Sequence, residues 1–84
     1  MMKKSHIGDT ILPETMWEQR VSNLLKSELK RKGVTYGQLV QKLAEIGVDE
    51  REANIKNKLF RGKFSAVFLV QCLHAIGIDT MKIN

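Results

Sequence analysis

The chain has 84 residues, which is enough for one small domain and no more. Hydrophobic residues make up 43% of it, too many for a disordered protein, and the single cysteine, Cys72, excludes an internal disulfide. We therefore expect one folded domain whose stability depends on packing, helped by self-association.

Three features of the sequence indicate a cytoplasmic protein. The basic opening Met1–Lys4 is followed by polar residues and not by the apolar stretch of a signal peptide. The densest apolar run, Ala66–Val70, is far shorter than a transmembrane helix, so we expect no membrane association. A chain with one cysteine also suits a reducing compartment.

Positive charge is concentrated in two central segments. The chain carries a formal net charge of +5 at pH 7. Arg20–Lys42 holds six basic residues against one acidic residue, and Arg51–Lys63 holds five against one, while the rest of the chain is acidic on balance. This distribution favours a basic face that binds a polyanion. The alternative is an ordinary solvated surface.

Residues 1–12 are polar and aperiodic, which predicts a flexible N-terminal arm ahead of a domain over residues 13–84. Pro13 suits the first turn of a helix, and Thr15 and Glu18 have the spacing of a capping box. Gly33 marks the end of this helix. Its apolar stripe recurs every three or four residues: Trp17, Val21, Leu24, Leu25 and Leu29.

Thr35 and Gln38 form a second capping box, which predicts a helix that ends at Gly47. Its apolar side consists of Leu39, Val40, Leu43 and Ile46. Asp49 and Glu52 repeat the start signal for a third helix, which runs to about Arg61 and stops at Gly62.

Ser65 can cap a fourth helix, which Gly77 closes and on which Ile78 folds back. This helix is apolar almost all round, so we expect it to be the central, buried element. Four helices, or at most five, with short connections and no strand-like alternation predict a compact all-α domain. The predicted core consists of Trp17, Leu24, Leu39, Leu43, Ile55, Leu59, Phe68 and Leu73.

The third helix has the pattern of a surface that reads DNA. On a helical wheel we place Ala53, Ile55, Leu59 and Phe60 toward the core. The opposite side gathers Glu50, Arg51, Asn54, Asn57, Lys58 and Arg61. Arginine and lysine can donate to guanine and asparagine can pair with adenine, so the basic and amide residues of this set are the candidate base contacts. The alternative is a polar face that only solubilises the domain.

The order of motifs resembles phage-repressor and Cro-like helix-turn-helix domains. The resemblance covers roughly Leu24–Asp79 and rests on Leu29–Thr35, Leu39-Val40, Leu43, Arg61-Gly62-Lys63 and Leu73–Ile78. It implies a lambda-repressor-like fold, DNA binding, homodimerisation and transcriptional control. The chain departs from the family in the longer turn Ala44–Asp49, and in Val40, where a small alanine is usual.

Other basic and polar residues are candidate contacts to phosphate. In a helix-turn-helix domain the start of the second helix approaches the DNA backbone, which makes Thr35, Tyr36 and Gln38 candidates; partial burial is the equal alternative for Tyr36. The lysines on or after the first helix (Lys26, Lys30, Lys32) and at the margins of the third helix (Lys56, Lys63) are candidates as well.

No motif indicates an enzyme, a metal site or a cofactor. Cys72 and His74 are two residues apart on a helix and point about 200° from one another, so they cannot share a metal ion. We expect Cys72 to be a buried thiol and His74 to lie between helices. His6, Lys3 and Lys4 fall in the predicted arm.

The sequence thus predicts a small transcriptional regulator of a bacterium or a mobile element, which binds duplex DNA as a homodimer and reads it with Glu50–Arg61. The main alternative is a protein-interaction module of the same fold, of the antitoxin or adaptor kind. Binding of RNA or of a single strand is less favoured, because no aromatic residue is interleaved with exposed basic residues. No small-molecule ligand is expected.

Overall fold

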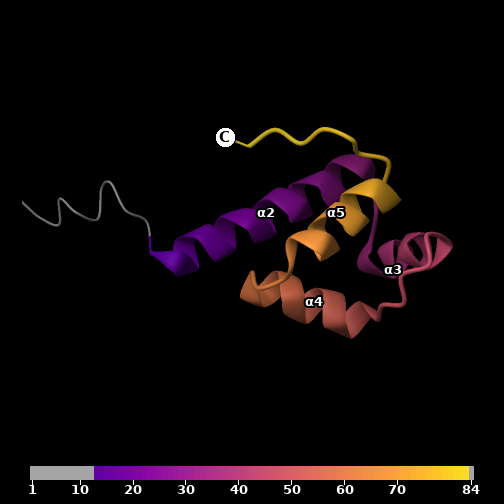
Figure 1. Ribbon diagram of the computed structural model, residues 1–84, viewed down its shortest axis with the longest axis horizontal. Helices are drawn as coiled ribbons and strands as arrows, with labels where there is room; N and C mark the ends of the chain where they lie inside the picture. The colour runs from indigo at the N-terminus through magenta and orange to yellow at the C-terminus, as the bar shows by residue number, and fades with distance from the viewer. Residues whose placement is uncertain (1–12, 84) are drawn as a thin grey trace, which may run out of the picture.

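The computed structural model describes residues 13–83 and contains four α-helices with short connections between them (Figure 1). They are α2 (Glu14–Lys32), α3 (Tyr36–Glu45), α4 (Glu52–Arg61) and α5 (Ala66–Ala75). No strand occurs between residues 13 and 83, which confirms the predicted all-α fold. The arm predicted over residues 1–12, with His6, Lys3 and Lys4, lies outside the described residues.

Local capping chemistry sets several of the helix ends, as predicted. The Thr35 hydroxyl accepts a hydrogen bond of 3.1 Å from the Gln38 backbone N–H, and the Gln38 side-chain oxygen accepts one of 2.9 Å from the Thr35 N–H. The Ser65 hydroxyl accepts a hydrogen bond from the Phe68 N–H at the start of α5. Gly33 and Gly62 end α2 and α4 in the left-handed conformation, with φ of 69° and 67°.

Two predicted helix starts are wrong. Helix α2 begins at Glu14 behind Pro13, whose ring fixes φ near its helical value, so Thr15 already lies inside the helix and cannot cap it. Helix α4 begins at Glu52, behind Arg51 and without a side-chain cap, so Asp49 lies too far ahead of it.

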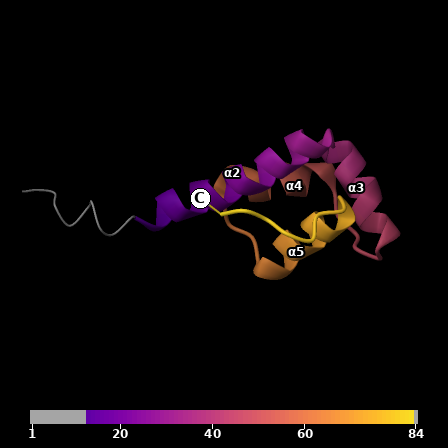
Figure 2. The same ribbon diagram turned by 90° about the horizontal axis from the view of Figure 1, so that it is seen from above.

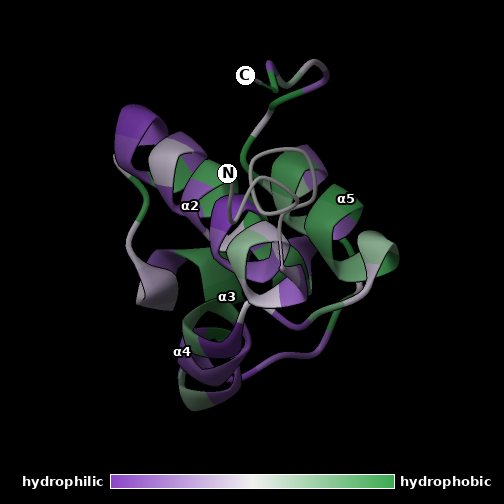
Figure 3. Ribbon diagram, turned by 90° about the vertical axis from the view of Figure 1, so that its left-hand side faces the viewer, coloured by the Kyte–Doolittle hydropathy of each residue, from purple (hydrophilic) through white to green (hydrophobic). Residues whose placement is uncertain are grey.

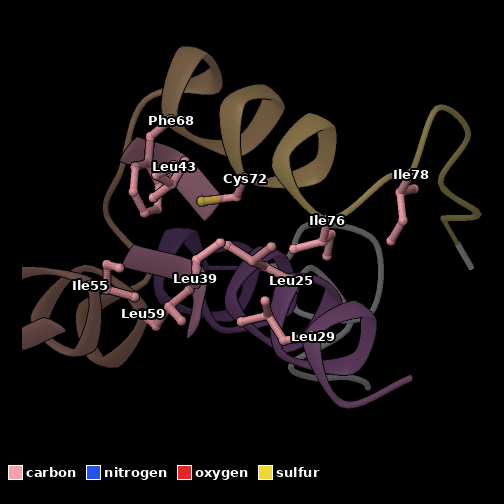
Figure 4. Close-up of a cluster of buried hydrophobic side chains, with 10 residues drawn as sticks. All are labelled: Leu25, Leu29, Leu39, Leu43, Ile55, Leu59, Phe68, Cys72, Ile76 and Ile78. Carbon is pink, nitrogen blue, oxygen red and sulfur yellow. The ribbon is translucent and has the colours of Figure 1, made fainter. Parts of the chain in front are cut away.

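The helices pack pairwise around one core. Helix α2 packs against α4 and α5, and α3 packs against the same two helices (Figures 1 and 2). The buried apolar side chains are Leu25, Leu29, Leu39, Leu43, Ile55, Leu59, Phe68, Cys72, Ile76 and Ile78. Most of them point toward one another between the helices, while Ile78 comes from the C-terminal segment (Figure 4). This core holds α4 with one face inward and the other free.

Five of the predicted core residues are confirmed: Leu39, Leu43, Ile55, Leu59 and Phe68. Leu24 and Leu73 are only half-buried. The prediction for Trp17 is wrong, because this side chain is 53% exposed. Helix α2 is longer than the helices it packs on, and its first turns extend beyond them (Figure 1). Trp17 lies on this extension, with the Arg20 guanidinium 5.4 Å from its ring centre.

The prediction that α5 is the central element is also wrong. Phe68 and Cys72 are buried, but Val67 and Val70 are 64% and 62% exposed. The helix is coloured hydrophobic along most of its length in Figure 3, yet it covers only one side of the core. His74 is exposed and does not lie between helices.

The chain after α5 folds back as predicted. The Ile78 N–H donates to the Leu73 carbonyl oxygen over 2.8 Å, and the Ile78 side chain is buried. None of the helices within residues 13–83 is long and apolar enough to span a membrane.

Candidate nucleic-acid interface

Helix α4 presents a polar and basic outer face. Ile55 and Leu59 are buried on its inner face, which fixes the rotation of the helix about its axis. Four of the five predicted base contacts are exposed: Arg51, Asn54, Asn57 and Arg61. Asn54, Asn57 and Arg61 belong to α4 itself, and Arg51 directly precedes it.

The fifth predicted base contact, Lys58, does not lie on this outer face, and nor does Glu50. The Lys58 Nζ lies 2.6 Å from the Glu50 Oε2 and 4.3 Å from the ring centre of Phe68. The Glu50 side chain is only 9% exposed. The Lys58 ammonium is therefore turned toward α5, where it also supplies the charged partner that the largely covered Glu50 carboxylate needs.

The Glu50 carboxylate is held in its charged form. Burial acts to raise its pKa, but hydrogen bonds from Lys58, from the Arg51 N–H and from Asn54, together with the Lys58 charge, lower the pKa below its ordinary value. The ion pair joins the segment before α4 to the middle of that helix.

Phe60 and Ala53 lie on the outer face of α4, contrary to the prediction that they face the core. Phe60 is 88% exposed. Each residue of a helix turns by about 100°, so Phe60 lies roughly 140° from Ile55 and close to Asn57 and Arg61. An aromatic ring is therefore interleaved with basic and amide side chains. The sequence argument against binding of RNA or of a single strand was that no aromatic residue is interleaved with exposed basic residues. The position of Phe60 shows that this argument does not hold.

Three helices contribute to one hollow beside Phe60. It has a volume of about 360 Å³ and is lined by Lys26 of α2, Tyr36 of α3, and Lys56, Asn57, Leu59 and Phe60 of α4. We call it the Tyr36–Phe60 groove. A neighbouring hollow shares Lys26 and Tyr36 and continues past Lys30 and Thr35. The structure thus brings Lys26, Lys30, Thr35, Tyr36 and Lys56 to one side of the molecule.

The remaining predicted phosphate contacts lie elsewhere or are paired. Lys32 and Gln38 line a separate hollow together with Lys42 and Glu45. Lys63 lies 3.8 Å from Glu18. Lys56 pairs with Glu52 over 3.3 Å, although both side chains stay more than half exposed. Within residues 13–83, Lys26, Lys30, Arg51 and Arg61 make no ion pair.

The C-terminal end of α4 is fixed to α2 by two backbone contacts. A Cβ atom at Gly62 would lie 2.6 Å from the carbonyl carbon of Glu18, so only glycine fits there. The buried Ser22 hydroxyl donates to the Leu59 carbonyl oxygen, which lies in the last turn of α4 and needs a partner outside the helix. These contacts position Phe60 and Arg61, which lie between Leu59 and Gly62 in the sequence.

Sequence reasoning missed two residues of this region. The signal for Phe60 was present, because its spacing from Ile55 places it on the outer side of the helix whatever its hydrophobicity. Glu50 gave no such signal, since its partner Lys58 is eight residues away and the pair forms only when the segment before α4 folds over.

Cys72 is a buried thiol, as predicted, and burial raises its pKa to about 12. The part of the chain from 13 to 83 contains no group of three His, Cys, Asp or Glu side chains that could hold a metal ion.

Residues 17–81, which include α3, α4, α5 and most of α2, match a family described as a domain of unknown function, DUF6471. The chain matches no curated protein and no solved structure.

Proposed function

The chain belongs to the DUF6471 family, and we propose that it is a non-enzymatic protein that binds duplex DNA through the outer face of α4 and regulates transcription. The observation that carries the proposal is the convergence of basic, amide and phenol side chains from three helices on one side of the molecule. Asn54, Asn57 and Arg61 are exposed on α4, and Lys26 of α2 and Tyr36 of α3 line one hollow together with Asn57. A face of this composition matches the phosphates and base edges of DNA.

Base reading is assigned to Arg51, Asn54, Asn57 and Arg61. Asparagine can donate to and accept from the adenine edge in the major groove, and arginine can donate twice to guanine. Lys58 is left out of this set because its ammonium is paired with Glu50.

Phosphate binding is assigned to the neighbouring helices. Lys26, Lys30 and Lys56 supply charge around the hollows that Thr35 and Tyr36 border. In this proposal α3 and α4 are the helix-turn-helix pair. The packing of α3 on α4 and the capping box at Thr35 support this assignment.

The protein acts as a homodimer in this proposal, and the outer face of α5 is the contact between copies. Val67 and Val70 are exposed there, and no residue of Ala66–Ala75 is an acid, a lysine or an arginine. Two copies with a net charge of +5 repel one another over most of their surfaces, so a face without fixed charge is the one on which they can meet.

Paired titrations test the proposal. Each variant is titrated by fluorescence anisotropy on two labelled duplexes, one selected from random sequences and one scrambled, at two salt concentrations. Lys26→Ala should weaken binding to both duplexes alike and lower the salt slope by about one unit per lost phosphate contact. Asn57→Ala should cost about 1–3 kcal/mol on the selected duplex with little change on the scrambled one.

Lys42→Ala is the matched control, because Lys42 belongs to the separate hollow of Lys32 and Gln38. It should leave both affinities nearly unchanged. Equal losses on both duplexes for Asn57→Ala would make α4 a phosphate clamp without base reading. If the unmodified protein binds neither duplex, DNA binding is refuted and an acidic protein becomes the better partner for this face.

A further inference from the structure

The exposed ring of Phe60 has no role in the packing of the domain. Its side chain is 88% exposed, so it contributes little to the core. The inner face of α4 is already complete with Ile55 and Leu59. The ring lines instead a groove whose other members are two lysines, an asparagine, a tyrosine and a leucine.

A second aromatic ring lines the same groove. Tyr36 is half-buried at the start of α3, where the capping box at Thr35 fixes the backbone, and it lines the same hollow as Phe60. Lys26 and Lys56 lie on the α2 and α4 sides, and Leu59 contributes an apolar floor. The volume of about 360 Å³ lies at the lower end of the range of roughly 300–1,000 Å³ that is typical of small-molecule pockets in proteins.

These groups match the chemistry of one nucleobase. A base offers two π faces to aromatic rings, a polar edge to an amide such as that of Asn57, and flanking phosphates to lysines. A base inside a perfect duplex has both faces covered by its neighbours, so it cannot enter the groove. Only a base that has left the stack can do so.

We propose that the Tyr36–Phe60 groove receives a single unstacked nucleobase, so that the protein prefers DNA with a locally unpaired base over a perfectly paired duplex. This inference rests on the proposed binding of DNA through α4. It adds a ligand class, the unpaired base, which the reading of paired base edges by Asn54 and Asn57 does not require.

The test compares two labelled duplexes of about 20 base pairs that differ only by one unpaired adenine at the centre. Stacking of one base on an aromatic side chain strengthens binding by about 5- to 150-fold, and the unmodified protein should prefer the bulged duplex by a factor in this range. Phe60→Leu should abolish the preference, so that the variant binds the bulged and the paired duplex with equal affinity. Phe60→Trp should retain the preference, because it keeps a π face.

Trp17→Leu is the matched control, since Trp17 is also an exposed aromatic residue beside a cation but lies outside the groove. It should leave the preference intact. A second readout uses Phe60→Trp in a Trp17→Phe background, where the only tryptophan lines the Tyr36–Phe60 groove. Its fluorescence should be quenched by the bulged duplex and far less by the paired one.

The outcomes separate the two proposals. Equal affinity of the unmodified protein for both duplexes overturns the unpaired-base inference and leaves DNA binding standing. Binding of the bulged duplex alone, with dependence on Phe60, supports the inference and overturns duplex reading. A preference that survives Phe60→Leu places the unpaired base elsewhere and overturns the inference. Binding of neither duplex overturns both.

Discussion

Gly62 lies directly on the backbone of Glu18, with its Cα hydrogen where any other residue would carry a side chain. A Cβ at this position would lie 2.6 Å from the Glu18 carbonyl carbon and 2.8 Å from the Glu18 Cβ. Gly62 also has a φ of 67°, which ends α4. The Arg61-Gly62-Lys63 motif therefore serves helix packing as well as helix termination.

Gly62→Ala should destabilise the domain more than Gly47→Ala does. Both glycines have positive φ, so alanine costs about 1–2 kcal/mol of backbone strain at either position. Only Gly62 has α2 against it, whereas a Cβ at Gly47 meets nothing within 4 Å. The close contact should add about 1–3 kcal/mol, measured by urea unfolding. Equal costs for the two variants would show that α4 moves away from α2 without penalty.

Lys58→Ala should lower the stability of the domain and leave DNA binding unchanged. Lys56→Ala should weaken DNA binding and leave the stability nearly unchanged. Loss of Lys58 leaves the buried Glu50 carboxylate without its ammonium partner, which should cost about 1–3 kcal/mol. The pair of Lys56 with Glu52 is exposed, so its loss should cost less than about 0.5 kcal/mol of stability. Urea unfolding and DNA titration at a temperature where both variants are folded will check this. A binding defect in Lys58→Ala equal to that of Lys56→Ala would contradict it.

The stabilisation that Glu50 provides should depend on pH. Its pKa is lowered in the folded state, so its contribution is complete above the pKa of the unfolded chain, about 4.3, and is lost as the pH falls below that value. The difference in unfolding free energy between the unmodified protein and Glu50→Gln should be constant from pH 7 to about 5.5 and shrink in more acidic buffers. Glu45→Gln, at an exposed carboxylate, serves as control. A difference that stays constant down to pH 3 would argue against the ion pair.

Val70→Glu should dissociate the proposed dimer. The substitution places a carboxylate on the uncharged outer face of α5, where the partner's face would bury it without a counter-charge. Sedimentation velocity at micromolar concentration should show a dimer for the unmodified protein and a monomer for the variant. Met16→Glu introduces the same charge at another exposed apolar residue, on α2, and should leave the dimer intact. A monomer for the unmodified protein, both free and on DNA, would remove the homodimer from the proposal.

Local chemistry explains which parts of the fold could be predicted from the sequence. The Thr35–Gln38 capping box and the stop at Gly33 depend on residues within one turn of each other, so the sequence contains all the information needed. The Asp49 prediction failed because α4 begins only at Glu52, and Glu50, which the prediction placed inside the helix, lies ahead of it and pairs with Lys58. No local pattern reveals that pairing.

The candidate site was predicted in part for the same reason. Asn57 and Arg61 follow from helical periodicity once Ile55 and Leu59 are taken as the inner face. Phe60 was misplaced because its hydrophobicity was given more weight than its spacing from Ile55. The Tyr36–Phe60 groove needs the distance between α3 and α4, which is a property of the tertiary fold.

Because α2 extends beyond its partners, its first turns make few tertiary contacts and its later turns are packed against the other helices. Residues Glu14–Trp17 are all exposed and begin without a side-chain cap, whereas Ser22, Leu25 and Leu29 are buried against the other helices. Fraying of the first turns therefore disrupts few tertiary contacts, while opening of the later turns requires the core to separate. Amide hydrogens before Glu18 should exchange with solvent through local opening, and those from Leu25 onward only through global unfolding. The contact of Gly62 with Glu18 lies at the boundary between the turns of α2 that open locally and those that open only on global unfolding.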